Sequence, residues 1–221
     1  MSNEGFAMTG RILAIGDVHG CNHRLRQLLD RIEIDPRTDA LIFVGDYLDR
    51  GPDARGTIDT LLDIKATCPN TVFLRGNHES MFLNYYTEGR DEALFLYNGG
   101  TSTLDSYGLP LAEARRGSGF PEDHLHFLSA LPLFYETEQY LFVHAGVRPG
   151  IPLADQTPDD LLWIRHEFIE SDEDFGRIVV FGHTPLPEPL IESNKIGIDT
   201  GAVYGGRLTC IELPSRIIHQ A

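Results

Sequence analysis

Gly45-Asp46-Tyr47-Leu48-Asp49-Arg50-Gly51 directly follows the apolar run Ala40–Val44, and this abrupt change from apolar to charged residues organises the chain. A short apolar run of this kind is typical of a buried strand. Charged side chains are rarely buried unless they are paired or bind a metal ion. A polar turn with an internal ion pair would account for the cluster if it stood alone.

The same design recurs four more times, and each time an apolar run ends in a possible metal ligand with a glycine close by. The segments are Ile12–Ile15 followed by Gly16–Gly20 (GDVHG), Thr71–Leu74 followed by Arg75–Glu79 (RGNHE), Tyr140–Val143 followed by His144–Gly146 (HAG), and Ile178–Phe181 followed by Gly182–Thr184 (GHT). Side chains at the carboxyl ends of strands in an α/β sheet converge on one crevice. Glycine permits tight turns and close backbone approach there. The recurrence therefore predicts one shared site.

The order of predicted elements changes halfway along the chain. Helical periodicity over 23–34, and again after Pro52 and Asp53, places a helix between successive strands of the first half, which is a right-handed crossover unit. The second half is mostly strands, with a hairpin over 133–143. We therefore predict an α/β (α+β) fold, a sandwich of two mixed β-sheets flanked by α-helices.

One domain is expected over 10–221, because the chain has ample length for a single buried core. Residues 1–9 are expected to form a flexible leader. Residues 87–119 combine weak periodicity with several glycine turn signals, and we expect an inserted helical lobe there. A short helix is expected over 121–131, with His124 and His126 on its surface.

Composition limits the classes of partner. The formal net charge is −15 at pH 7, which opposes binding to nucleic acid and to anionic membranes. No apolar run approaches the ~20 residues of a membrane span. Three widely spaced cysteines, Cys21, Cys68 and Cys210, form no disulfide framework, and a reducing, cytoplasmic location is therefore expected.

The strand ends supply six candidate metal ligands with oxygen or imidazole donors: Asp17, His19, Asp46, Asn77, His144 and His183. This set is too large for one zinc ion, which usually takes three or four protein ligands, and it suits two metal ions that share a carboxylate. Manganese, iron or zinc would accept these donors, and magnesium less readily. Two such ions activate water and clamp both ends of an in-line displacement at phosphorus.

Three further residues complete a site for phosphoester hydrolysis. Arg50 offers a bidentate fork to phosphoryl oxygens. His78, next to the candidate ligand Asn77, is placed to protonate a leaving oxygen. Asp49 is expected to orient His78 and to raise its pKa through its negative charge.

The motif set GDVHG, GDYLDRG, GNHE, HAG and GHT resembles the phosphoprotein phosphatase family of calcineurin-like metallophosphoesterases, and most closely its small bacterial and phage-type serine/threonine phosphatases. The resemblance covers residues 16–184 and implies the same sandwich fold. It implies one metal ion on Asp17, His19 and Asp46, a second on Asp46, Asn77, His144 and His183, a general acid at His78 with Asp49 behind it, and phosphate binding by Arg50 and Arg165. The motif HAG has alanine where eukaryotic members usually have glycine, and a small residue should serve equally.

The resemblance leaves the substrate open between two classes of phosphoester. Symmetrical diadenosine tetraphosphatases share the metal motifs and resemble this chain over 198–206. There Tyr204 either stacks on an adenine or packs on the domain, and packing is the favoured interpretation. A protein serine/threonine phosphatase, acting on phosphorylated protein, is the first expectation for function.

Two other classes of function are less well supported by the residues present. A non-catalytic phosphate-binding module has no need of a general acid such as His78 with Asp49 behind it. A nuclease of the same fold is disfavoured by the acidic net charge and by the intact Asp49-Arg50 pair. A metal-dependent phosphomonoester hydrolase is therefore the expected class.

Overall fold

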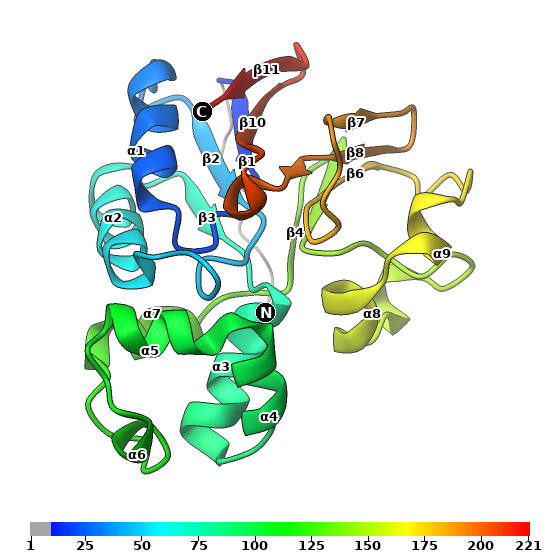
Figure 1. Cartoon of the computed structure of the whole chain (residues 1–221). Helices are drawn as coiled ribbons and strands as arrows, with labels where there is room; N and C mark the ends of the chain where they lie inside the picture. The colour runs from blue at the N-terminus through cyan, green and yellow to red at the C-terminus, as the bar shows by residue number, and fades with distance from the viewer. Residues whose placement is uncertain (1–9) are drawn as a thin grey trace.

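The computed structural model describes residues 10–221 as two β-sheets packed face to face with helices outside them (Figure 1). Residues 1–9, the predicted leader, lie outside the described residues. The first sheet has the strand order β11-β10-β1-β2-β3, with β9 paired to β10. Its strands are β1 Ile12–Ile15, β2 Ala40–Phe43, β3 Thr71–Phe73, β9 Asp199–Thr200, β10 Arg207–Leu213 and β11 Ile217–Gln220.

The second sheet has the strand order β4-β5-β6-β8-β7. Its strands are β4 Phe134–Glu136, β5 Tyr140–Val143, β6 Ile178–Phe181, β7 Leu190–Ile191 and β8 Lys195–Gly197. β5, β6 and β8 are parallel, and β4 and β7 pair antiparallel at the two edges. In the first sheet β1 to β3 are parallel and β10 pairs antiparallel to β1. Both sheets are mixed, and the predicted sandwich is confirmed.

The helices form three groups around the sandwich (Figure 1). α1 Asn22–Arg31 and α2 Ala54–Thr67 lie beside the first sheet, and α8 Pro158–Trp163 and α9 His166–Ile169 lie beside the second. A helical lobe joins the sheets at one end and consists of α3 Asn77–Glu88, α4 Glu92–Phe95, a kinked turn over Leu96–Gly100 in which Gly99 has a positive φ, α5 Thr101–Ser106, α6 Leu111–Ala114 and α7 Glu122–Ser129. Short 3-10 turns occur at Leu153–Asp155 and Ala202–Tyr204. Within residues 10–221, no helix is both long and apolar enough to cross a membrane.

Strand β1 shows why the molecule is layered. All four of its residues are buried, and successive side chains point to opposite faces of the sheet. Leu13 and Ile15 pack in the core cluster with α1 and α2, whereas Ile12 and Ala14 pack between the two sheets. A third cluster, which includes Phe168, lies between the second sheet and α8 and α9. Because both faces are covered, central strands are continuous apolar runs rather than alternating ones.

The predicted lobe and the following short helix are both present, but the prediction for His124 is wrong. His124 on α7 is only 4% exposed. Its Nδ1 is hydrogen bonded to the hydroxyl of Tyr107 at 2.8 Å, and its Nε2 lies 3.1 Å from Oδ1 of Asp59. A buried imidazole is tolerated where both nitrogens find partners, and those partners come from the turn after α5 and from α2, which spacing along the chain does not reveal. His126 is exposed, as predicted.

We expect His124→Leu to lower the free energy of unfolding by about 1–3 kcal/mol, because the buried hydroxyl of Tyr107 loses its partner. His126→Leu is the matched control on the same helix, and a surface change of this kind should stay within about 0.5 kcal/mol. Urea unfolding of both variants measures the difference. Equal destabilisation would mean that the buried pairing contributes nothing.

Candidate metal centre

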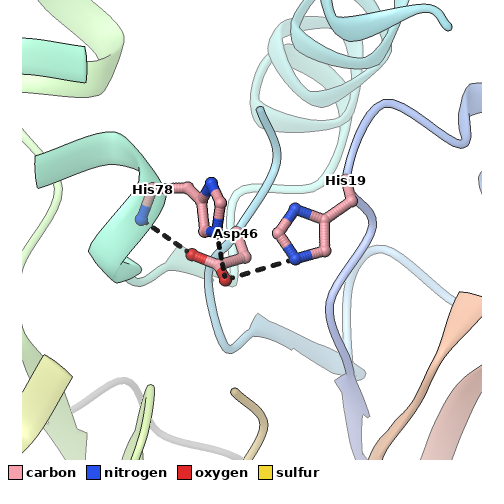
Figure 2. A group of neighbouring side chains, drawn as sticks. All are labelled: His19, Asp46 and His78. Atoms are coloured by element: carbon pink, nitrogen blue, oxygen red, sulfur yellow. Dashed lines mark hydrogen bonds and ion pairs between the residues drawn. The ribbon is translucent and has the colours of Figure 1, made fainter. Parts of the chain in front are cut away.

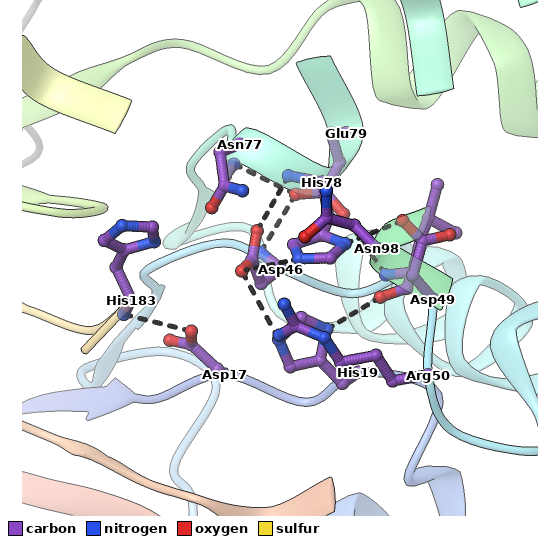
Figure 3. Close-up of polar contacts among 12 residues, drawn as sticks. Asp17, His19, Asp46, Asp49, Arg50, Asn77, His78, Glu79, Asn98 and His183 are labelled. Atoms are coloured by element: carbon purple, nitrogen blue, oxygen red, sulfur yellow. Dashed lines mark hydrogen bonds and ion pairs between the residues drawn. The ribbon is translucent and has the colours of Figure 1, made fainter. Parts of the chain in front are cut away.

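The six predicted ligands come from both sheets and meet near the carboxyl ends of the strands. Figure 3 labels all of them except His144. Asp17 and His19 follow β1, Asp46 follows β2, His144 follows β5 and His183 follows β6. Asn77 differs from its prediction as a strand end. β3 stops at Phe73, and Asn77 is the first residue of helix α3, after Gly76 as the N-cap. Its side chain nevertheless reaches the other ligands.

The carboxylate of Asp46 lies at the centre of the cluster (Figure 2). Its Oδ2 lies 3.4 Å from Nε2 of His19 and 4.0 Å from Nε2 of His78. Its Oδ1 lies 3.4 Å from Nε2 of His144. Among the described residues, the acids and histidines able to hold a metal ion form two groups that share Asp46, one with His19 and His78 and the other with His144 and His183. One carboxylate that faces imidazoles on both sides suits a bridge between two ions.

Backbone carbonyls orient two of the histidines. Nδ1 of His19 lies 2.9 Å from the carbonyl oxygen of Leu48, and Nδ1 of His144 lies 2.9 Å from that of Val44. Each Nδ1 must donate to its carbonyl, so in the neutral imidazole Nε2 carries a lone pair that faces the cluster. Nε2 of His144 then lies 2.9 Å from Oδ1 of Asn77. Two acceptors this close need a proton or a cation between them.

Unpaired atoms within the cluster provide a test of whether metal ions fit. Within residues 10–221, Oδ1 of Asp17 and Nε2 of His183 and of His78 are buried without a hydrogen-bond partner. Buried polar atoms are nearly always hydrogen bonded. The second oxygen of Asp17 accepts from the backbone N–H of His183 at 3.0 Å, which fixes the carboxylate (Figure 3). Divalent metal ions would satisfy the free donor atoms of Asp17 and His183, and the residues therefore fit such ions.

Two glycines and a strained backbone let the ligands converge. A Cβ at Gly76 would lie 2.1 Å from Oδ1 of Asp46, and a Cβ at Gly182 would lie 2.0 Å from Oδ1 of Asp17. Positive φ angles are uncommon outside glycine. Of the seven such residues in the described chain, five are predicted site residues: His19, Asp46, Asp49, Arg50 and His183. Backbone strain of this kind concentrates at functional sites.

Burial and mutual charge set the protonation states. Burial lowers the pKa of His19 to about 3 and that of His183 to about 2, which favours the neutral imidazole that binds metal. Burial, with the charges of Asp199 and Asp46, raises the pKa of Asp17 well above its usual range. Burial would also raise the pKa of Asp46, but the neighbouring histidines hold it well below that range. A bound divalent cation would favour the ionised form of both carboxylates.

Glu79 supports the centre, and sequence analysis assigned it no role. Its fully buried carboxylate accepts four backbone hydrogen bonds, from the N–H groups of Asp46 at 2.9 Å, Tyr47 at 2.8 Å, Leu48 at 3.2 Å and Gly76 at 2.9 Å. Glu79 is also the third residue of α3, in a capping arrangement with Gly76. The sequence shows a glutamate at a position typical of helix capping. It does not show that this glutamate accepts hydrogen bonds from the loop that carries Asp46.

The two predicted phosphate-binding arginines both lie against candidate ligands. Nη1 of Arg50 lies 2.8 Å from Nε2 of His19, and its guanidinium lies 5.5 Å from the ring centre of Tyr204. Nη1 of Arg165 donates to the carbonyl oxygen of His183 at 3.1 Å and to Oγ1 of Thr184 at 3.2 Å. Tyr204 is 60% exposed, and its ring lies beside the guanidinium of Arg50. Packing on the domain and stacking on an adenine both stay predictions for this residue.

His78 and Asp49 form a buried pair, with Nδ1 of His78 2.7 Å from Oδ2 of Asp49. Burial lowers the pKa of His78 to about 4 and raises that of Asp49 to about 8. The prediction that Asp49 raises the pKa of its partner is therefore wrong. Loss of water around the imidazole outweighs the attraction of the Asp46 carboxylate, and the positive charges of Arg50 and Arg165 lower the pKa of His78 further.

The chain belongs to the calcineurin-like phosphoesterase family, whose sequence model matches residues 10–209. It is therefore a metallophosphoesterase, a hydrolase of phosphoester bonds, and the two groups around Asp46 are its candidate metal-binding residues. The family resemblance predicted from the motifs is confirmed.

Individual relatives divide between two kinds of substrate. Serine/threonine-protein phosphatase 1 of Salmonella typhimurium is 33% identical over 209 residues, which are 90% of this chain and 89% of that protein. The asymmetrical bis(5'-nucleosyl)-tetraphosphatase PrpE of Anoxybacillus flavithermus is 26% identical over 230 residues, with the same two coverages. A solved structure provisionally assigned as a diadenosine tetraphosphatase superposes with a TM-score of 0.75 at 24% identity, over 97% of this chain and 94% of the other. At 24% identity, the superposition on this solved structure shows a shared fold and says nothing about the substrate.

We expect Glu79→Ala to lower the free energy of unfolding by at least about 3 kcal/mol, because four buried N–H groups lose their acceptor at about 1–3 kcal/mol each. The variant should also lose bound metal, since the loop that carries Asp46 is released. Glu88→Ala, at an exposed position of the same helix, is the matched control. Urea unfolding and metal analysis of the two preparations make the comparison. Similar losses in both would contradict the supporting role of Glu79.

Proposed function

We propose that this chain is a protein serine/threonine phosphatase that hydrolyses phosphomonoesters with two divalent metal ions. The observation that carries the proposal is the buried pair of His78 and Asp49, in which Nε2 of His78 lies beside Asp46 without a partner in the described chain. A serine or threonine alkoxide is a very basic leaving group and needs a proton donor of this kind. The similarity to a bacterial serine/threonine phosphatase over most of the chain supports the same substrate class.

We assign one ion to Asp17, His19 and Asp46, and the other to Asp46, Asn77, His144 and His183. Manganese is the first choice for these oxygen and imidazole donors, and iron or zinc would also suit them. When bound, the ions would activate water for attack and neutralise the charge of the phosphoryl group. The chain itself supplies fixed donors, a proton and two arginines.

The His78–Asp49 pair can supply a proton even though burial lowers the pKa of the imidazole. Nδ1 and Oδ2 share one proton across 2.7 Å, and the pair carries no net charge whichever atom holds it. In either form Nε2 of His78 carries a second hydrogen. Transfer of that hydrogen as a proton to the leaving oxygen leaves one negative charge on the pair. The positive charges of Arg50 and Arg165 stabilise that negative charge.

Arg50 and Arg165 are proposed to bind the phosphoryl oxygens. Both guanidinium groups lie against candidate metal ligands, where a phosphoryl group would meet the ions. Hydrogen bonds to charged groups contribute about 1.5–3 kcal/mol each. The two arginines would therefore hold the substrate and stabilise its charge as the bond to the leaving oxygen breaks.

The remaining parts of the proposal follow from composition and packing. We take residues 10–221 as one domain. The net charge of −15 disfavours nucleic acid and anionic membranes, and the partner is proposed to be a phosphorylated protein or small phosphoester. Cys21, Cys68 and Cys210 are free thiols, which suits a reducing, cytoplasmic location.

A dinucleoside polyphosphate is the second candidate substrate, and the position of Tyr204 favours it. Its exposed ring beside Arg50 offers a surface on which a nucleobase can stack. A nucleotide phosphate is, however, a much less basic leaving group than an alkoxide. A hydrolase for that substrate has less need of the His78–Asp49 pair.

Parallel kcat/KM measurements with added manganese test the proposed substrate class. The substrates are phosphoserine, phosphothreonine and phosphotyrosine peptides and diadenosine tetraphosphate. We expect the best of the phosphoserine and phosphothreonine peptides to exceed diadenosine tetraphosphate by at least about tenfold, a difference of about 1.4 kcal/mol in transition-state binding. Faster turnover of the dinucleotide, with its selective loss in Tyr204→Ala, would instead support the second candidate. Hydrolysis of no substrate would contradict both.

We expect His78→Asn to keep both metal ions and to lose about a hundredfold or more in kcat on a phosphoserine peptide. On p-nitrophenyl phosphate the loss should be markedly smaller, because nitrophenolate hardly needs a proton. Asp46→Asn is the comparison that should lose metal as well as activity. Metal content and kcat are measured on the same preparations. Loss of metal in His78→Asn, or equal losses on the two substrates, would move His78 from the acid to the ligands.

A further inference from the structure

Thr103 of helix α5 contacts the acid pair from within the helical lobe. Its side chain is fully buried. Its Oγ1 lies 2.6 Å from Oδ1 of Asp49 and 2.9 Å from the backbone nitrogen of the same residue. The backbone N–H can only donate, so the hydroxyl accepts from it and gives its own hydrogen to the carboxylate.

The two oxygens of Asp49 consequently have separate partners. Oδ1 accepts from Thr103, and Oδ2 faces Nδ1 of His78. One hydroxyl holds both the backbone and the carboxylate of Asp49, which fixes the rotation of that side chain. Catalytic imidazoles are commonly oriented by a further group, which here is Asp49, and Thr103 in turn orients Asp49.

The loop that carries Asp49 also needs support from outside. Asp49 and Arg50 both have a φ of 68°, in the left-handed region. The segment 99–106 of the lobe bonds to this loop through Gly99, whose carbonyl accepts from the Arg50 N–H at 3.2 Å, and through Ser102, whose hydroxyl donates to the Arg50 carbonyl at 3.3 Å. Strained residues persist only where their surroundings over-determine them. Of these lobe residues, Thr103 contacts the carboxylate of Asp49, the partner of His78.

We propose that Thr103 is a positioning residue for proton transfer. Its hydroxyl fixes Asp49, and Asp49 in turn directs the Nε2 hydrogen of His78 toward the leaving oxygen. This inference rests on the general-acid role proposed for His78. Removal of the hydroxyl should therefore slow each reaction according to how strongly its leaving group needs a proton.

Thr103→Val removes the hydroxyl and keeps the shape of the side chain. We expect kcat on a phosphoserine peptide to fall by about tenfold or more, a part of the 10²–10⁴-fold that a general acid contributes. On p-nitrophenyl phosphate the same variant should lose less than about threefold, because the leaving group hardly needs a proton. Thr103→Ser, which restores the hydroxyl, should recover most of the rate. Thr101→Val, at an exposed position of the same helix, is the matched control and should match wild type.

A double-mutant cycle separates positioning from packing. In an Asp49→Asn background, Thr103→Val should cause little further loss, because its effect passes through the missing carboxylate. Equal losses of Thr103→Val on the two substrates, or additive losses in the cycle, would overturn the proposal. Thr103→Ala takes its place in both measurements if Thr103→Val fails to fold.

His78→Asn, measured alongside, distinguishes the possible failures. If the loss of kcat in His78→Asn depends on the leaving group and the loss in Thr103→Val does not, only the positioning role of Thr103 is overturned. If His78→Asn shows no such dependence, the general-acid role fails and the role of Thr103 fails with it. If wild-type protein hydrolyses no phosphoserine peptide, the alkyl ester β-glycerol phosphate replaces it in every comparison. In that case the proposal that the substrate is a phosphorylated protein fails, and the measurements with β-glycerol phosphate still test the positioning role of Thr103.

Discussion

The buried carboxylate of Glu79 fixes the end of strand β2 against the start of helix α3. It accepts backbone hydrogen bonds from Asp46 on one side and from Gly76 on the other. Asp46 is shared by both candidate metal groups, and Asn77 and His78 directly follow Gly76. Burial and the charge of Asp46 raise the pKa of Glu79 to about 7, and the backbone N–H groups oppose that rise. A carboxylate so deeply buried is tolerated because its oxygens are saturated with donors.

The centre also ties the two sheets together. Asp17 after β1 accepts from the backbone of His183 after β6, and His144 after β5 donates to the carbonyl of Val44 after β2. Each sheet therefore holds ligands of the other in place. Ligands with this arrangement exist only in the packed sandwich, so the binding of metal and the stability of the fold are linked. Bound cations would offset the repulsion between the buried carboxylates of Asp17, Asp46 and Asp199.

Much of this architecture could be predicted from the sequence, because the deciding signals are local. Apolar runs that end in charged residues marked the strands and the candidate ligands. What could not be predicted depends on contacts between distant segments. The burial of His124 requires Tyr107 and Asp59. The lowered pKa of His78 results from its burial, which the sequence does not show. The contact of Thr103 with Asp49 joins residues 54 positions apart.

The position of β1 in the first sheet has a consequence for how the chain folds as it is synthesised. β1 lies between β2 and β10, and Ile12 pairs with Leu213. While translation proceeds, the strand that precedes Asp17 has a partner on one side only and presents unpaired backbone groups on the other. Contacts between residues so far apart close slowly, and an open strand edge invites pairing with another chain. That edge of β1 therefore stays open to other chains until residues 207–213 have emerged.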